Sequence, residues 1–124
     1  MRPRSCKNKG KRAQNEVVEK LLHVFTTLEP DDVKSTTMGD HGEDVKLSPA
    51  ARRLFPFSIE VKNQEKLNIW TSYEQAVKNA KQHIPLLIFK RNRSDMMCSL
   101  KFDDLLKILK QLHEQSGSNS TPST

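Results

Sequence analysis

Asp44, Glu60 and Lys62 are the residues of this 124-residue chain whose types and spacing could do chemistry together. Fifteen residues separate Asp44 from the tripeptide Glu60-Val61-Lys62. Segment 55–62 alternates apolar and polar residues, which predicts a strand with Glu60 and Lys62 on one side and the apolar side chains on the other. Asp44 begins another short strand-like run. If these two strands pair, two carboxylates and one ammonium group converge at a strand end.

Such a cluster fits the hydrolysis of phosphodiesters. Two carboxylate ligands suit Mg²⁺, and Mn²⁺ as a substitute, because these hard cations keep several waters and bind phosphate oxygens. A lysine beside the cation can orient or deprotonate an attacking water, while the cation stabilises the charge that develops on the phosphate. These residues therefore predict a metal-dependent enzyme that needs no small-molecule cofactor.

The tripeptide Glu-x-Lys carries no weight by itself. Eight Glu and fourteen Lys residues in this chain give about one such tripeptide by chance. Its meaning comes from its context, because it lies in an alternating strand that follows an Asp-led strand and an amphipathic helix. The alternative interpretation is a solvated surface pair, which is what an acid and a lysine on one strand face usually form.

The elements that must position these residues indicate the α/β class. Helical spacing of apolar residues predicts helices at 11–29, 69–82 and 102–115. Alternation and β-branched residues predict strands at 33–37, 44–47, 55–62, 86–89 and 96–100, with a turn at 38–42 and a short helical turn capped by Ser48. The expected buried stripes contain Trp70, Tyr73, Ala76, Val77 and Ala80 in one helix, and Leu105, Leu106, Leu109 and Leu112 in the last.

The net charge of +6 is concentrated at the start of the chain. Residues 1–12 hold six basic residues and no acidic one, whereas the remaining chain is balanced. A basic arm is typical of proteins that bind polyanions, since each neutralised phosphate releases counterions. The alternative is a solvated terminus. We expect a flexible arm at 1–8, one domain at 9–115 and a disordered tail at 116–124.

Composition excludes several classes of protein. Cys6 and Cys98 fit neither a disulfide framework nor a zinc site, and the four histidines have no ligand spacing. No apolar run approaches the roughly 18 residues that a membrane span needs, and the basic start leads into no signal peptide. We therefore expect a cytoplasmic protein in a reducing compartment, with no membrane partner.

Four segments of the chain resemble, in order, the motifs of PD-(D/E)-x-K nucleases. These segments are KGKRAQ (9–14), VKSTT (33–37), GEDV (42–45) and IEVK (59–62). They are similar in particular to the archaeal-type and phage-encoded Holliday junction resolvases. The resemblance implies a restriction-endonuclease-like fold, with a central mixed sheet flanked by helices, a Mg²⁺-dependent activity and a homodimer that acts on DNA, in a protein encoded by a phage.

The resemblance also implies roles for individual residues. Asp44, Glu60 and the Val61 carbonyl would be metal ligands, and Lys62 would be the catalytic lysine. Residues that would contact DNA lie in the first two motifs: Lys9, Lys11, Arg12, Lys34, Ser35 and Thr36. A basic turn after segment 86–89 adds Lys90, Arg91 and Arg93 as a second candidate phosphate-binding cluster, for which a solvated hairpin tip is the alternative.

One position departs from the resolvase pattern. These enzymes carry Glu four residues after the glycine of the first motif, where this chain has Gln14. On a helical wheel Gln14 falls on the side of the apolar stripe, and Glu16 points nearly opposite. Gln14 is therefore the better candidate for the site residue of the first helix, although Glu16 takes that place if the helix is rotated.

The expected function is Mg²⁺-dependent cleavage of DNA, with four-way junctions as the preferred substrate and paired symmetric nicks as the outcome. Another PD-(D/E)-x-K nuclease, such as a repair or nicking enzyme, is the first alternative. A non-catalytic basic DNA-binding protein, in which Asp44 and Glu60 are surface acids, is the alternative from a different class.

Overall fold

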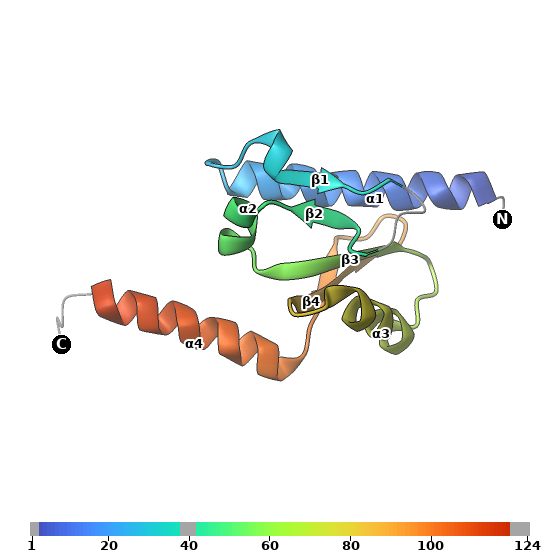
Figure 1. Ribbon diagram of the computed structural model, residues 1–124. Helices are drawn as coiled ribbons and strands as arrows, with labels where there is room; N and C mark the ends of the chain where they lie inside the picture. Colours follow the sequence, from blue (N-terminus) through green and yellow to red (C-terminus); the bar gives the residue numbers. More distant parts are fainter. Residues whose placement is uncertain (1–2, 38–41, 120–124) are drawn as a thin grey trace.

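A computed structural model describes residues 3–37 and 42–119, with side chains from residue 8 to residue 116 within these ranges. It confirms an α/β fold whose mixed five-stranded sheet is flanked by helices (Figure 1). The elements are α1 (Pro3–Val24), η1 (Pro30–Asp32), β1 (Val33–Ser35), β2 (Val45–Leu47), α2 (Pro49–Leu54), β3 (Phe57–Asn63), α3 (Ile69–Ala80), β4 (Ile84–Lys90), β5 (Met97–Ser99) and α4 (Phe102–Asn119).

The strands lie in the order β1-β2-β3-β4-β5. All neighbours are antiparallel except β3 and β4, which run parallel over seven pairs from Phe57↔Ile84 to Asn63↔Lys90. The parallel pair requires a crossover, which α3 provides. This arrangement places the Asp-led strand β2 directly beside β3, as the paired-strand hypothesis requires.

The two long helices of the domain cover opposite faces of the sheet. Helix α1 contacts β1, β2 and β3, and α3 contacts β3 and β4. Alternation along β3 turns Ile59 and Val61 toward α1, with which they share the main apolar cluster. The buried members of this cluster are Ala13, Val17, Leu21, Val33, Val45, Ala51, Ile59 and Val61. In Figure 1, β1 is drawn in front of α1.

Helix α1 differs from its predicted bounds at both ends. It begins at Pro3 rather than at residue 11, so residues 3–8, which we expected as a flexible arm, are helical. The helix continues through Gly10, although glycine is less favourable there than alanine by about 1 kcal/mol. It ends at Val24 rather than at 29, shortly before two β-branched threonines.

Helix α3 is rotated from its predicted stripe. The structure buries Ser72, Ala76 and Ala80, whereas Trp70 is 83% exposed and Val77 is also exposed. The prediction that Trp70 and Val77 lie in the core is therefore wrong. Small side chains let α3 approach the sheet closely, and a bulky tryptophan on that side would hold it away.

Helix α4 leaves the domain instead of packing on it (Figure 1). The predicted burial of its leucines is wrong, because four leucines and one phenylalanine of this helix are exposed. These exposed residues are Phe102, Leu105, Leu106, Leu109 and Leu112, and their helical spacing places them in one stripe. We call them the α4 stripe.

The predicted C-terminal tail is only partly described. Residues 116–119 belong to α4, and residues 120–124 lie outside the described residues. Most of the predicted turn at 38–42 also lies outside them.

Candidate active site

Asp44 lies where β2 and β3 stop pairing. The two strands share the register pair Val45↔Ile59, and the Asp44 amide donates to the Ile59 carbonyl at 2.8 Å. The Asp44 carboxylate then accepts from the Val61 amide through Oδ2 at 2.7 Å. A side-chain oxygen thus takes the place of a backbone acceptor in the ladder. This bond fixes the carboxylate beside β3.

Glu60 lies on the face of β3 that α3 covers, and it is 6% exposed. Its Oε1 accepts from Asn79 Nδ2 of α3 at 3.2 Å, and its Oε2 lies 3.7 Å from Lys62 Nζ. The structure therefore confirms that Glu60 and Lys62 share one side of the strand. Their pairing under α3 is not that of a solvated surface pair.

Burial disfavours the ionised form of both carboxyl groups. Burial raises the pKa of Asp44, against the lowering effects of the Val61 amide and the Lys62 ammonium. Burial also raises the pKa of Glu60, and the charge of Asp44 raises it further, while Asn79 and Lys62 lower it. Lys62 alone does not offset burial and repulsion. A cation between the carboxylates would relieve both.

Residues of β1 and α1 hold the backbone of Asp44. The Asp44 carbonyl accepts from the amide of Thr36 at 2.9 Å and from its hydroxyl at 3.2 Å. Lys11 Nζ donates to Ser35 Oγ at 2.8 Å and to the Thr36 carbonyl at 3.1 Å, and Ser35 Oγ donates to Asn15 Oδ1. Three predicted DNA-contacting residues, Lys11, Ser35 and Thr36, therefore have internal partners that position Asp44.

A partly buried ion pair fixes the segment that precedes Asp44. Arg52 Nη2 donates to Glu43 Oε1 at 2.7 Å, and Arg52 Nη1 donates to the Phe57 carbonyl at 2.8 Å. Both side chains of the pair are less than one-fifth exposed. The pair joins α2 and the start of β3 to the residue directly before Asp44. Sequence reasoning placed Glu43 in a motif but missed Arg52, because α2 brings it there only in the folded chain.

Gln14 is the residue of α1 that combines burial with an unused polar atom. It is 5% exposed, and its Oε1 has no hydrogen-bond partner among the described residues. Gln14 lies between Lys11 and Asn15, both of which contact the end of β1 that holds Asp44. Gln14 approaches the sheet from the α1 side, between Ala13 and Val17 of the apolar cluster.

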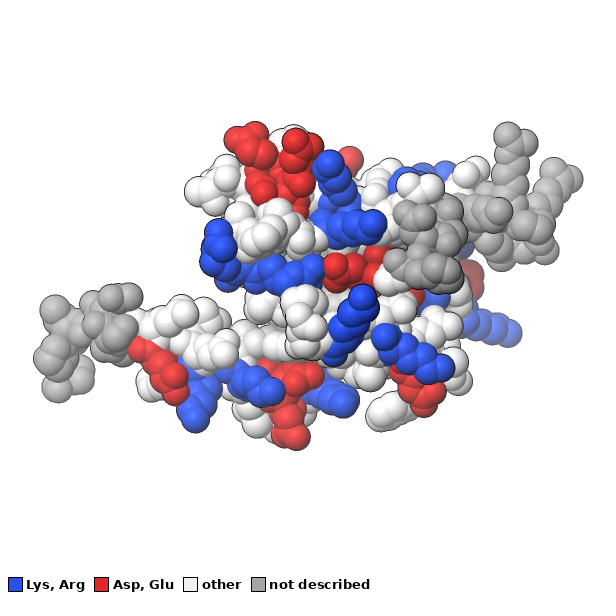
Figure 2. All heavy atoms as spheres, in the orientation of Figure 1, with Lys and Arg blue, Asp and Glu red and all other residues white. Residues whose placement is uncertain are grey.

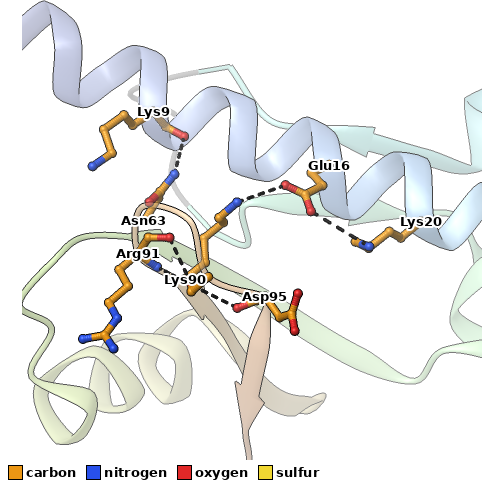
Figure 3. Close-up of polar contacts among 8 residues, drawn as sticks. Lys9, Glu16, Lys20, Asn63, Lys90, Arg91 and Asp95 are labelled. Carbon is orange, nitrogen blue, oxygen red and sulfur yellow. Dashed lines mark hydrogen bonds and ion pairs between the residues drawn. The ribbon is translucent and has the colours of Figure 1, made fainter.

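Glu16 has a different environment, which Figure 3 shows. Its carboxylate lies 3.5 Å from Lys90 Nζ at the end of β4 and 3.9 Å from Lys20 Nζ on α1. Nearby, Asn63 Nδ2 donates to the Lys9 carbonyl at 3.4 Å. These contacts tie α1 to the ends of β3 and β4. Glu16 therefore has two cationic partners, whereas the Gln14 amide oxygen has none in the described structure.

These environments predict opposite results for two alanine substitutions. Gln14→Ala should lower metal-dependent cleavage by about 10- to 100-fold, the range typical of residues that support a metal site. Glu16→Ala should leave cleavage within a fewfold of the wild-type rate, because it removes partly exposed ion pairs. Single-turnover cleavage rates measure both effects, and thermal unfolding controls for lost stability. A larger loss for Glu16→Ala would move the site residue of α1 to Glu16.

The other predicted DNA-binding residues divide between two faces. Alternation places Lys90 on the α1 side of β4, where Glu16 pairs with it. Arg91 and Arg93 are exposed in the turn that follows. Arg12 is exposed on α1, and Lys34 is exposed on β1 beside Asp31, at 3.4 Å. Lys90 and Lys34 therefore lie on opposite faces of the sheet.

The donor set fits a hard divalent cation. Among the described residues, no group of three or more His, Cys, Asp or Glu side chains lies close enough together to hold a metal. Glu60 supplies a buried carboxylate, Asp44 a partly buried one, and Gln14 an amide oxygen that has no partner among the described residues. Mg²⁺ is commonly held by one or two carboxylates, with waters and substrate phosphates completing its octahedron.

Comparison with known proteins gives one family. Residues 5–121 match the model of the family described as "Phage putative PDDEXK endonuclease". The comparisons with curated proteins and with solved structures gave no match. Among the helices of the described residues, none has the length and apolar character that crossing a membrane requires.

Proposed function

The chain belongs to this family of phage endonucleases, and from that premise we propose that it is a Mg²⁺-dependent DNA endonuclease that resolves four-way junctions. The observation that carries the proposal is the convergence of Asp44, Glu60 and Lys62 where β2 and β3 part. In a non-catalytic DNA-binding protein, a buried Glu60 carboxylate beside the charge of the partly buried Asp44 would serve no purpose. Such a protein would gain stability and DNA affinity by losing these charges.

Asp44 and Glu60 would hold the cation, together with the Val61 carbonyl and the Gln14 amide oxygen. When bound, the cation supplies an activated water and neutralises charge on the scissile phosphate. Lys62, which is about one-quarter exposed and lies 3.7 Å from Glu60 Oε2, can orient the attacking water as an ammonium, or accept its proton after first releasing one of its own to solvent. Asn79 keeps Glu60 in place from α3. Because α3 covers this side of β3, it also limits the access of bulk water to Glu60.

The junction as substrate rests on the resemblance of four motifs to those of the junction resolvases. Resolution needs two nicks in strands related by the two-fold symmetry of the junction. A homodimer with an isologous interface supplies two sites in that relation, whereas one chain has a single site. The α4 stripe supports this proposal, because a row of exposed large apolar side chains on one helix face commonly marks a protein–protein contact. We therefore propose that two copies pair through it.

A cleavage assay on a synthetic four-way junction tests the proposal. In Mg²⁺ the protein should make paired nicks in opposing strands and leave 5′-phosphate and 3′-hydroxyl ends that ligase can seal. It should bind the junction at least about tenfold more tightly than linear duplex of equal length, a difference of about 1.4 kcal/mol. Flap and nicked substrates serve as comparisons.

The possible outcomes separate the alternatives. Equal cleavage of junction and linear duplex would contradict the resolvase assignment and favour another nuclease of the same fold. Preferential cleavage of a flap would identify a repair-type enzyme. No cleavage of any DNA in Mg²⁺ or Mn²⁺ would contradict the catalytic role of Asp44 and Glu60.

A further inference from the structure

Two lysines lie directly opposite each other on the exposed face of β1 and β2. Lys34 and Lys46 are register partners, and both are exposed. Like charges in directly opposed positions of an antiparallel pair are destabilising. The partner of Lys34, Asp31, lies 3.4 Å away but is almost fully exposed, so it offsets little of this repulsion. The fold therefore keeps a local excess of positive charge at this place.

This lysine pair lies on the face of the sheet that presents the active site. Val33 and Val45 are buried in the cluster with α1, so alternation turns Lys34 and Lys46 to the other face. Glu60 is on that same face, where it meets α3. Helix α3 contacts β3 and β4 and leaves the lysines of β1 and β2 exposed. The site thus has a helix on one side and an open, basic strand pair on the other.

The spacing suits a nucleic-acid backbone. Lys46 follows Asp44 by two residues, about 7 Å along an extended strand. The charges of one DNA strand repeat every ~3.4 Å along the helix axis, and successive phosphates are farther apart than this because the strand winds around the axis, so the distance corresponds to one or two nucleotides. A strand whose scissile phosphate lies at Asp44 would therefore pass Lys46 with a neighbouring phosphate. Lys34, on the adjacent strand, would lie beside the same stretch of backbone.

Basic side chains continue from the lysine pair onto α2. Figure 2 shows Lys and Arg in blue over β1, β2 and α2, around acidic side chains near the middle of the face. The last turn of α2 carries Arg52 and Arg53. Arg52 is engaged with Glu43, whereas Arg53 is exposed and has no ion-pair partner among the described residues. Arg53 is thus free to extend the basic surface.

We propose that Lys34, Lys46 and Arg53 form a track for the DNA backbone that leads the strand into the active site along β1 and β2. The inference rests on the proposed function, which requires DNA at Asp44 and Glu60. It goes further in assigning Lys46 and Arg53, and in the direction from which DNA enters. The repulsion between the two lysines is relieved when a phosphate lies between them, so the pair is better suited to bound DNA than to the free protein.

Salt dependence of binding tests the track. A fluorescein-labelled junction and a linear duplex are titrated in EDTA, so that no cleavage occurs, across a series of KCl concentrations. Lys34→Ala/Lys46→Ala should flatten the plot of log K against log salt by about 1.8, since each lost contact with duplex phosphate changes the slope by about 0.9. Lys107→Ala/Lys110→Ala removes the same charge from exposed positions of α4 and should leave the slope unchanged. An unchanged slope for the first variant, or equal flattening for both, would overturn the proposal.

Lys46→Glu provides a second readout that loss of folding cannot imitate. It replaces a repulsive cross-strand pair by an attractive one with Lys34, so the unfolding midpoint should stay the same or rise. DNA binding should nevertheless fall at least tenfold at low salt. If Lys46→Glu binds DNA as tightly as the wild-type protein does, the proposed contact of these basic residues with the DNA backbone is refuted. If the wild-type protein cleaves DNA but the lysine variants bind DNA as tightly as it does, the track is wrong and the proposed function stands. If the wild-type protein neither binds nor cleaves DNA, the track and the proposed function are both overturned.

Discussion

Asp44→Asn and Glu60→Gln should each lower Mg²⁺-dependent cleavage by at least about 10²- to 10³-fold, the loss typical when a group that stabilises transition-state charge is removed. Each change removes a charged oxygen ligand and keeps the shape of the side chain. Asn79 can still donate to the amide oxygen of Gln at position 60, and the Val61 amide to that of Asn at position 44. Junction binding should therefore persist in both variants. Cleavage within tenfold of the wild-type rate would contradict the site.

The same variants should be more stable than the wild-type protein without metal. Burial raises the pKa of both carboxyl groups, so the folded state binds their protons more tightly than the unfolded state does. Folding is consequently favoured as pH falls toward the raised pKa values and disfavoured above them, where both groups are ionised. An uncharged amide removes that penalty at neutral pH.

Thermal unfolding with and without Mg²⁺ measures both effects. The unfolding midpoint of the wild-type protein should rise when Mg²⁺ is added, because the ion binds the folded state, whereas the midpoints of the two variants should respond much less. Glu74→Gln, at an exposed position of α3, is a matched control that should change neither cleavage nor the response to metal. A variant that still gains full stability from Mg²⁺ would place the ion elsewhere.

Leu109→Glu should separate the proposed dimer into monomers. The leucine lies in the α4 stripe, and it is exposed in the single chain, so the fold does not depend on it. Because Leu109 is 50% exposed in the single chain, its burial at the interface contributes about 1 kcal/mol, and a two-fold interface loses it twice. This loss alone should raise the dissociation constant of the dimer by about 30-fold, and the desolvation of the new glutamate charge raises it further.

Sedimentation measures this change directly. At micromolar concentration the wild-type protein should sediment as a dimer of 14.2-kDa chains, and Leu109→Glu as a monomer that nicks junctions on one strand at a time. Gln111→Glu places the same charge on an exposed, polar position of α4 and should leave the dimer intact. A wild-type monomer, or a dimeric Leu109→Glu variant, would contradict assembly through the α4 stripe.

The sequence was most informative where period-two alternation could be read over a long segment. Segment 55–62 predicted that Glu60 and Lys62 share one side of β3, and the structure places them 3.7 Å apart. The alternating strands, the Ser48 cap of α2 and the order of elements were predictable for the same reason, since each depends on neighbours in the chain.

Contacts between distant segments could not be predicted in this way. Asn79 reaches Glu60 only because α3 is rotated so that small residues face the sheet, and hydrophobicity alone favoured Trp70 on that side. Likewise, the leucines of α4 have the spacing of a core-facing stripe, which a helix that packs on its own domain and a helix that packs on another chain share. Periodicity shows that an apolar face exists, but it does not show what covers that face.

The Val61 amide of β3 donates its hydrogen bond to the Asp44 carboxylate, so the position of this carboxylate depends on the pairing of β2 with β3. Any local opening that separates β2 from β3 also breaks this bond and carries Asp44 away from Glu60. The site and the β2–β3 pairing therefore belong to one cooperative unit, whose opening free energy sets the fraction of molecules in which the proposed metal site is intact. Mutations that weaken this pairing, however far from Glu60, would lower activity by reducing that fraction and leave the chemistry of the intact molecules unchanged.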